Sequence, residues 1–371
     1  MRAAIVHYWL LNMRGGEKVV EALCRLLPDA DIFTLFYDPN RVSETIRSHR
    51  VHASFLQPFR KAYRSLLPIM PLALENFDLR EYDLIVSSES GPAKGVLTSS
   101  NSRHVCYCHT PMRYLWELYP AYRNEWNQSG WKRALMTPLT NYLRLWDFAS
   151  AARVDEFVAN SDNVRRRIWK TYRRGSQVVC PPVSVETFYW RPPQDYYLMV
   201  AELVPYKRID AAVRTFNQNG RKLRIVGDGP EYKALKRSAA SNIEFCGRVS
   251  DPDLRELYAH CRAFVIPGEE DFGITAVEAL ASGKPVLAHA RGGSLEIVPE
   301  FGGLLYDDAD GLTQAIERWD DCEFALDPHA LQAYAARFSE GEFARQMLPI
   351  LFETNVDRDV PHASRGLSAR R

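Results

Sequence analysis

The chain has 371 residues, 46% of them hydrophobic and 25% charged, a composition typical of a globular protein long enough for two domains. Its 47 basic and 46 acidic side chains give a net charge of +1, so no overall field favours nucleic acid as a partner. No apolar run approaches the roughly 20 residues of a membrane span, the first residues lack a signal-peptide pattern, and the seven cysteines are an odd number. These features predict a cytoplasmic protein.

The first half of the chain predicts a doubly wound α/β domain. Residues 3–8 form an apolar run typical of a buried strand, and an amphipathic helix is expected at residues 17–27. Between them lie Gly15 and Gly16, which lack a Cβ and so let a ligand approach the backbone closely, although a plain turn also explains them. Further strands are expected at residues 31–36, 84–87, 105–108, 156–159 and 178–180, and helices at residues 131–154 and 163–172.

One segment of this half mixes aromatic and basic residues. Residues 54–74 place Phe55, Phe59 and Tyr63 near helical spacing, with Arg60 and Arg64 between them. Such a segment suits the surface of an anionic membrane. A helix that packs on the core and turns a basic face to solvent explains it about as well, so both interpretations stay open.

The strand expected at residues 105–108 leads directly into His109. Ligands of doubly wound folds collect beyond the carboxyl ends of strands, which makes His109 a candidate site residue, although a single histidine in such a place is more often structural. Arg113 and Tyr114, a few residues later, are weaker candidates for contact with an acceptor.

The second half repeats the pattern of strand, glycine loop and helix, which predicts a second parallel sheet covered on both faces. Strands are expected at residues 197–201, 223–226, 243–245, 263–266 and 286–288, and helices at residues 210–217, 231–239, 274–281, 309–319 and 328–336. Pro181 and Pro182 mark a hinge. The expected division is therefore a first domain at 1–183, a second domain at 184–338, a final helix within 339–355 and a disordered tail at 356–371.

An acidic loop in this half predicts a ligand. Glu270 precedes the loop's Phe272 and Gly273, and Glu278 lies in the helix that follows. Free amides at the start of that helix, near Gly273, Ile274 and Thr275, suit a phosphate or diphosphate, which leaves the carboxylates to hold neutral hydroxyl groups. A sugar joined to a nucleoside diphosphate offers both groups. An ordinary turn between strand and helix is the plainer alternative for two glutamates at this spacing.

Two cations follow the first strand of this half. Lys207 and Arg208 come just after the strand expected at residues 197–201, and they would face the acidic loop. We interpret them as a clamp on the diphosphate of the donor, with the lysine as a point charge and the arginine as a fork. Solvated surface charge is the alternative.

Taken together, the segments MRGGEKV, CHTPMRY, LVPYKR, VGDGP and EEDFGITAVEALASGKPV resemble the retaining glycosyltransferases of family 4, and within that family the bacterial polysaccharide mannosyltransferases. The resemblance implies the GT-B fold, which is α/β with two Rossmann-like doubly wound domains and a cleft between them. It also implies that residues 1–183 are the acceptor-side domain and residues 184–338 the nucleotide-sugar-binding domain, with a final helix at 339–355 that crosses back to the first domain.

The resemblance further implies roles for individual residues. Glu270 would face the donor sugar, Glu278 the ribose and His109 the reacting bond, while Lys207 grips the diphosphate. The remaining residues implied for donor binding are Gly15, Gly16, Arg208, Gly247, Arg248, Val249, Phe272, Gly273, Ile274 and Thr275. The chain departs from the family at Glu202, where many members carry a diphosphate-binding arginine.

The implied function is transfer of a hexose with retention of configuration, with mannose from GDP-mannose as the best candidate. The acceptor would be lipid-linked or an oligosaccharide in bacterial surface polysaccharide synthesis, with peripheral contact at the cytoplasmic face of the inner membrane. No metal or other cofactor is expected. A nucleotide-sugar epimerase of the same fold and a weakly active partner subunit are the alternatives.

Overall fold

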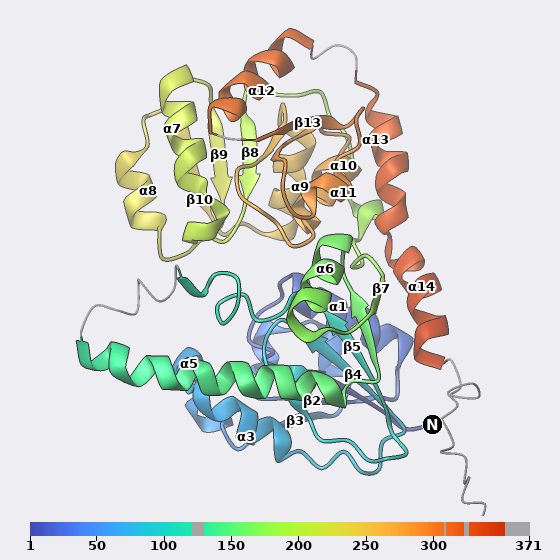
Figure 1. The fold of residues 1–371 in the computed structure, drawn as a ribbon. Helices are drawn as coiled ribbons and strands as arrows, with labels where there is room; N and C mark the ends of the chain where they lie inside the picture. Colours follow the sequence, from blue (N-terminus) through green and yellow to red (C-terminus); the bar gives the residue numbers. More distant parts are fainter. Residues whose placement is uncertain (121–129, 308, 323–325, 353–371) are drawn as a thin grey trace, which may run out of the picture.

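The computed structural model describes residues 1–120, 130–307, 309–322 and 326–352, and within them it contains two parallel β-sheets covered by helices (Figure 1). The first sheet has seven strands in the order β3-β2-β1-β4-β5-β6-β7, and the second has six in the order β10-β9-β8-β11-β12-β13. Every named strand pair is parallel. Both sheets reverse their strand order at a central strand, so each is doubly wound, and the predicted GT-B architecture is confirmed.

The central strands of the first sheet are fully buried, although β4 and β5 include polar and charged residues beside their apolar ones. All five residues of β1 and all six of β4 and β5 are buried, as expected for a sheet with helices on both faces. The strands are β1 (Ala3–His7), β2 (Asp31–Thr34), β3 (Val51–Ala53), β4 (Leu84–Glu89), β5 (Arg103–Cys108), β6 (Glu156–Ala159) and β7 (Ser176–Val178). The α-helices among them are α1 (Gly15–Leu26), α2 (Glu44–Arg47), α3 (Met70–Glu75), α5 (Gly130–Ser150) and α6 (Asp162–Tyr172).

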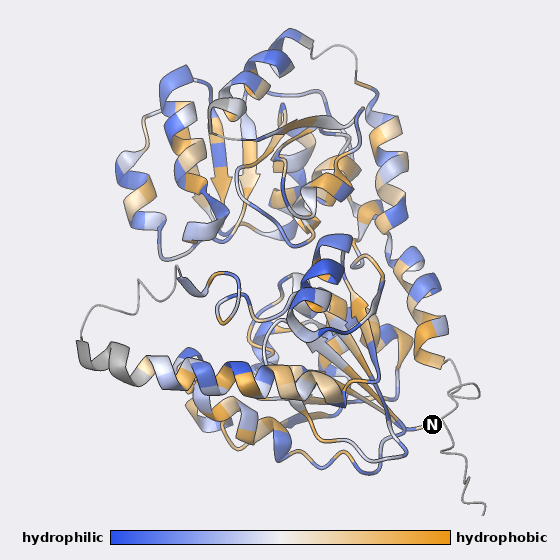
Figure 2. Cartoon of the chain, viewed as in Figure 1, coloured by the Kyte–Doolittle hydropathy of each residue, from blue (hydrophilic) through white to orange (hydrophobic). Residues whose placement is uncertain are grey.

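The second sheet is also parallel, with helices between its strands. Its strands are β8 (Tyr197–Val200), β9 (Leu223–Val226), β10 (Ile243–Gly247), β11 (Phe264–Ile266), β12 (Val286–His289) and β13 (Gly303–Tyr306). Its helices are α7 (Ile209–Asn219), α8 (Tyr232–Ser238), α9 (Asp251–His260), α10 (Ile274–Ala281), α11 (Ser294–Ile297), α12 (Ala309–Cys322) and α13 (Pro328–Ala335). Figure 2 shows hydrophobic residues concentrated along the strands and mixed hydropathy along the covering helices.

The final helix, α14 (Glu340–Phe352), leaves the second sheet and packs on the first. Its buried residues Phe343, Met347, Ile350 and Leu351 join the core that β1, α1 and β4 build. The guanidinium of Arg103, at the start of β5, donates a hydrogen bond to the backbone oxygen of Leu351 at 3.3 Å. The expected tail at residues 356–371 lies outside the described residues.

Two expectations need correction. The strand expected at residues 178–180 is β7, which lies earlier, because it is a half-exposed edge strand whose place is fixed by pairing of Ser176 with Phe157 rather than by apolar residues. The strands β3 and β13 were not expected at all, and both are short edge strands as well.

The aromatic and basic segment packs in part on the core, and its contact with a membrane stays a prediction. It forms a kinked 3-10 stretch at Gln57–Ile69 followed by α3, with Tyr63, Leu66 and Leu67 half-buried against the core. Phe55, Phe59 and Leu72, by contrast, are 50%, 59% and 63% exposed. Across the described residues, no helix has the length and apolar character needed to cross a membrane.

Candidate functional site

A cleft of about 890 Å³ lies between the two domains. It opens where β1 and β5 of the first sheet and β8, β9 and β11 of the second reach their carboxyl ends, which is where ligands of doubly wound folds bind. The expected site residues that line it are Gly15, Gly16, His109, Lys207, Arg248, Val249, Glu270, Phe272, Gly273, Ile274, Thr275 and Glu278.

The N-terminus of α10 points at this cleft. Gly273 begins the helix at φ 111°, a backbone conformation that favours glycine, and no side chain caps the helix. The backbone amide of Gly293 donates to the carbonyl of Glu270 at 2.8 Å, which fixes the loop before the helix. The amides of the first turn are therefore available for an anion, as the sequence predicted.

Lys207 and Glu270 form an ion pair inside the cleft. Lys207 follows β8 in a short 3-10 turn, Pro205–Lys207, and Glu270 follows β11, so two neighbouring strands bring the charges together. Burial by itself lowers the pKa of Lys207, but the carboxylate of Glu270 outweighs it, and the pKa lies above its ordinary value. The lysine therefore stays charged and suits a departing phosphate.

Glu278 lies one turn into α10 and is buried. The hydroxyl of Tyr258 donates to it at 3.0 Å, and the ammonium of Lys18, from α1 in the other domain, lies 3.5 Å away. Burial raises the pKa of Glu278, and Lys18 offsets part of this effect. A carboxylate with these partners can accept hydrogen bonds from sugar hydroxyl groups.

His109 faces the cleft from the end of β5 in the first domain. Its Nε2 lies 2.9 Å from the hydroxyl of Ser88 on β4, and a Cβ placed on Gly16 would lie 3.7 Å from the same nitrogen. Burial lowers the pKa of His109 to about 4, and the carboxylate of Asp271 opposes this only in part. The imidazole is therefore neutral at neutral pH.

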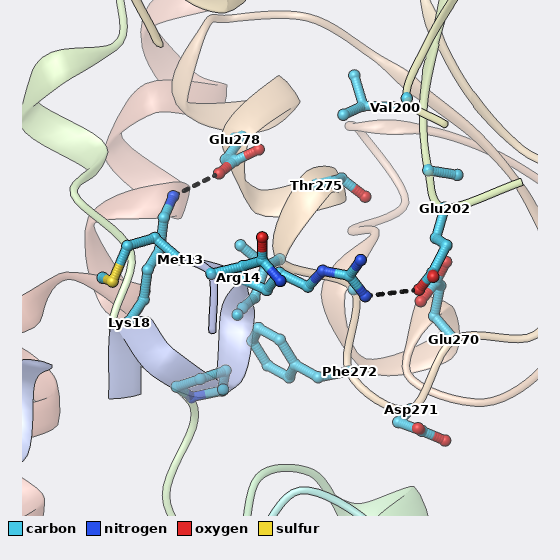
Figure 3. Close-up of a pocket in the computed structure, with 18 of the residues that line it drawn as sticks. Met13, Arg14, Lys18, Val200, Glu202, Glu270, Asp271, Phe272, Thr275 and Glu278 are labelled. Carbon is cyan, nitrogen blue, oxygen red and sulfur yellow. Dashed lines mark hydrogen bonds and ion pairs between the residues drawn. The ribbon is translucent and has the colours of Figure 1, made fainter. Parts of the chain in front are cut away.

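The two domains meet around this cleft, and Figure 3 shows two ion pairs across it. Arg14 contacts Glu202 at 2.9 Å, and Lys18 pairs with Glu278. A Cβ on Gly15 would lie 2.8 Å from the side chain of Ile274, so the start of α1 comes close to the start of α10. The glycine pair thus permits close contact between the two helix N-termini.

Four expected site residues lie elsewhere. Arg208 does not line the cleft, because a 3-10 turn places its side chain on the opposite side from Lys207, toward a second cavity. Gly247 accepts a backbone hydrogen bond from Gly227 at 2.7 Å and is not among the lining residues. Arg113 donates to Asp271 at 3.1 Å, and Tyr114 donates to the sulfur of Met112 at 3.1 Å.

Several charged residues of the cleft were not among the predicted site residues, and they include Arg14, Lys18 and Asp271. Arg14 and Lys18 are spaced i, i+4 across the first turn of α1, which places them on one face of the helix. That spacing, next to the glycine pair, was a signal in the sequence. Asp271 forms ion pairs with Arg113 and Arg167 of the first domain. These ion pairs join residues far apart in the sequence, so only the tertiary structure shows them.

Two family models match the chain over adjoining stretches. The model described as Glycosyltransferase Family 4 matches residues 13–187, and the model described as Glycosyl transferases group 1 matches residues 165–338. The first match covers the glycine pair and His109, and the second covers Lys207 and the acidic loop.

Relatives and solved structures agree with these models. An uncharacterised glycosyltransferase of Methanocaldococcus jannaschii is 29% identical over 41% of this chain and 45% of its own length. A GDP-mannose-dependent alpha-mannosyltransferase of Mycobacterium tuberculosis is 38% identical over 29% of this chain and 28% of its own. The chain thus spans less than half the length of these curated relatives.

Among solved structures, HepE of Anabaena in complex with UDP-glucose superposes with a TM-score of 0.71 at 17% identity, over 95% of this chain and 100% of HepE. This structural similarity supports the fold, and the two family models support the assignment of the chain to its family. The chain belongs to the group 1 glycosyl transferases of family 4, with the GT-B fold.

Proposed function

We propose that the protein is a retaining hexosyltransferase that uses a nucleotide sugar, with GDP-mannose as the best candidate donor. The observation that carries the proposal is the arrangement of Lys207 and Glu270 opposite the uncapped N-terminus of α10, with His109 facing them from the other domain. A cationic side chain and free amides suit a diphosphate, while the carboxylates suit sugar hydroxyls. The mannosyltransferase relative supports mannose as the donor sugar.

The proposed reaction is attack on the same face of the sugar that the diphosphate leaves. The bond between the anomeric carbon and the diphosphate oxygen breaks, and the acceptor oxygen forms the new bond on that face. The acceptor proton passes to the departing diphosphate, whose charge Lys207 and the amides near Gly273 stabilise. Because these groups can neutralise the leaving group, we propose that the reaction needs no metal ion.

His109 and Glu270 would act on the sugar rather than on the diphosphate. The sugar develops positive charge during the reaction, and a neutral imidazole does not repel this charge. A protonated imidazole would repel it. Glu270, already tied to Lys207, would hold hydroxyl groups of the sugar and link their position to that of the leaving group. Glu278 is proposed to hold the ribose.

The proposed acceptor is lipid-linked or an oligosaccharide, in bacterial surface polysaccharide synthesis. The exposed side chains of Phe55, Phe59 and Leu72 belong to the same stretch of sequence as the exposed basic residues Arg60 and Lys61. This combination supports peripheral contact with an anionic membrane. Sedimentation with vesicles of anionic and of neutral lipid tests it, and equal recovery with both, or with neither, would count against it.

The deciding experiment is a panel of GDP-mannose, GDP-fucose, UDP-glucose, UDP-galactose and UDP-N-acetylglucosamine, with and without EDTA. Tight binding of GDP-mannose, with slow release of GDP that EDTA leaves unchanged, is the expected result. Conversion of one sugar nucleotide to another without an acceptor would favour the epimerase. Binding without any turnover, even with acceptors present, would favour the partner subunit.

A further inference from the structure

A second cavity, of about 430 Å³, lies on the other side of the acidic loop from the cleft. It lies at the carboxyl ends of β11, β12 and β13 and shares only β11 with the donor cleft, and the loop after β5 lines it from the first domain. Its polar lining includes three guanidinium groups and two carboxylates, together with Tyr206 and His289. The guanidinium groups belong to Arg113, Arg208 and Arg291, and the carboxylates to Glu269 and Asp307. Its volume suits a small ligand.

Some of the arginine side chains around this second cavity are already paired with carboxylates, and others remain available to bind an anion. Glu269 is already paired with Arg167, which comes from the first domain. Arg113 pairs with Asp271 at 3.1 Å and lies 3.4 Å from the carboxylate of Glu117, while its buried Nε makes no hydrogen bond within the described part of the chain. Arg291, in contrast, makes no ion pair with any residue that the structure describes.

The loop that carries Arg291 is held in place by close backbone packing. A Cβ on Gly292 would lie 2.2 Å from the carbonyl oxygen of Glu270, and one on Gly293 would lie 2.0 Å from that of Phe272. The amide of Arg291 also donates to the carbonyl of His289 at 2.7 Å. The backbone of Arg291 is therefore fixed relative to the acidic loop, while its side chain is exposed to solvent.

Arg208 is held in an unusual conformation beside the same cavity. Its φ of 55° is left-handed, which is uncommon for a residue with a Cβ and is retained mainly where the surroundings or a function require it. Among the described residues, its guanidinium forms an ion pair with the half-exposed carboxylate of Asp210 at 3.4 Å, and Arg214 shares that carboxylate. A stronger, bidentate anion can compete for such a guanidinium.

Tyr206 separates the second cavity from the donor cleft and lines both. The guanidinium of Arg113 lies 5.3 Å from the centre of its ring, and the ammonium of Lys207 lies 5.5 Å from it. A ligand in the second cavity would therefore be separated by the ring of Tyr206 from Lys207, which we propose stabilises the leaving group.

We propose that the second cavity is a binding site for an anionic saccharide, a sugar that carries a phosphate or a carboxylate. Arg291 and Arg208 bind the anionic group, and the mixed polar lining around them binds hydroxyl groups. The site adds to the proposed function and does not depend on it, because it lies outside the donor cleft.

The test uses glucose 6-phosphate and glucuronate as probes, with glucose as the uncharged comparison, in titration calorimetry with saturating GDP present to occupy the donor cleft. Both charged sugars are expected to bind and glucose is not. Arg291→Gln should weaken their binding about tenfold, as expected for the loss of a charge-assisted hydrogen bond. Arg237→Gln, an exposed arginine on α8 that lines neither cavity, is the matched control and should bind as the unaltered protein does.

The same probes separate two sources of the ligand. If the charged sugar is part of the acceptor, incubation with the donor yields a product heavier by one hexose. If it is a free effector, it changes the rate of donor turnover and is recovered unchanged. Failure of both charged sugars to bind, or binding that Arg291→Gln leaves unaltered, overturns the proposal. Donor binding measured without these sugars decides the proposed function separately.

Discussion

Arg14 of the first domain contacts Glu202 of the second at 2.9 Å across the donor cleft. Glu202 stands where many members of the family carry a diphosphate-binding arginine, so here the second domain supplies a carboxylate and the first domain supplies the cation. A diphosphate in the cleft would compete with Glu202 for Arg14. The domain contact and the donor site are therefore linked through this pair.

This arrangement predicts opposite effects for its two partners. Arg14→Gln should weaken GDP binding about tenfold, because one charge-assisted contact is lost. Glu202→Gln should strengthen GDP binding, because it removes a repelling carboxylate and frees Arg14. Calorimetric titration with GDP measures both, and stability should change by less than ~1 kcal/mol in each variant since the pair is partly exposed. Weaker binding in Glu202→Gln would contradict this account.

The pair of Lys207 and Glu270 gives a second prediction. Lys207→Ala should lower the rate of transfer by about a hundredfold to a thousandfold, because it removes the main cation facing the leaving group. Glu270→Gln should lower it as well, through loss of sugar positioning. Single-turnover rates with saturating donor measure the effect, and circular dichroism shows whether the fold survives. Near-normal rates in both variants would show that the catalytic site is elsewhere.

A buried lysine in the first domain gives a prediction about stability. Lys94 is fully buried between Glu89, at the end of β4, and Asp147 of α5, and Asp147 also accepts from the indole of Trp116 at 2.7 Å. Lys94→Met leaves two carboxylates in the core without a cation and should cost ~3–5 kcal/mol in the free energy of unfolding.

Urea denaturation measures that cost. Combining Lys94→Met with Glu89→Gln and Asp147→Asn removes the unpaired charges and should recover much of the stability. If the triple variant is no more stable than Lys94→Met alone, then lost packing rather than unpaired charge explains the effect.

A buried histidine gives a prediction about pH. Burial lowers the pKa of His104 to about 4 from its ordinary value near 6.5, although Arg153 and Asp155 oppose the shift. Between these values the unfolded chain binds a proton that the folded chain does not, so the contribution of His104 to stability falls as the pH drops from about 6.5 to about 4.

Comparison with His104→Asn isolates this contribution, because the other titrating groups are common to both proteins. The free energy of unfolding of the unaltered protein should fall relative to that of the variant by about 1.4 kcal/mol for each pH unit below the ordinary pKa of histidine. Urea denaturation at pH 7 and pH 5 provides the measurement. Parallel pH dependence in the two proteins would mean that His104 is not held neutral.

Much of the fold could be predicted from the sequence where an element is buried on all sides. The helix at Ile274–Ala281 and the strand at Leu223–Val226 were predicted with their observed ends, because an apolar run and a glycine or proline boundary coincide there. Edge strands could not be predicted as well. In β7 the side chains are half-exposed, so pairing with β6 rather than hydrophobicity decides where the strand lies.

The sequence predicted those residues of the candidate site that directly follow a strand. His109, Lys207 and Glu270 each follow a central strand, and the structure brings all three to one cleft. Arg208 follows the same strand as Lys207, but one further residue of a tight turn sends its side chain to the other cavity. Arg14 and Lys18 were missed because their partners belong to the other domain.

The crossing of α14 has a consequence for how the chain folds. Phe343 and Met347, near the end of the chain, fill the core that β1 and α1 build near its beginning. The first domain therefore cannot complete its core during synthesis until the whole second domain has left the ribosome. Cutting the chain at the double proline would leave a fragment with an open apolar groove on α1, so the two halves are one unit of folding.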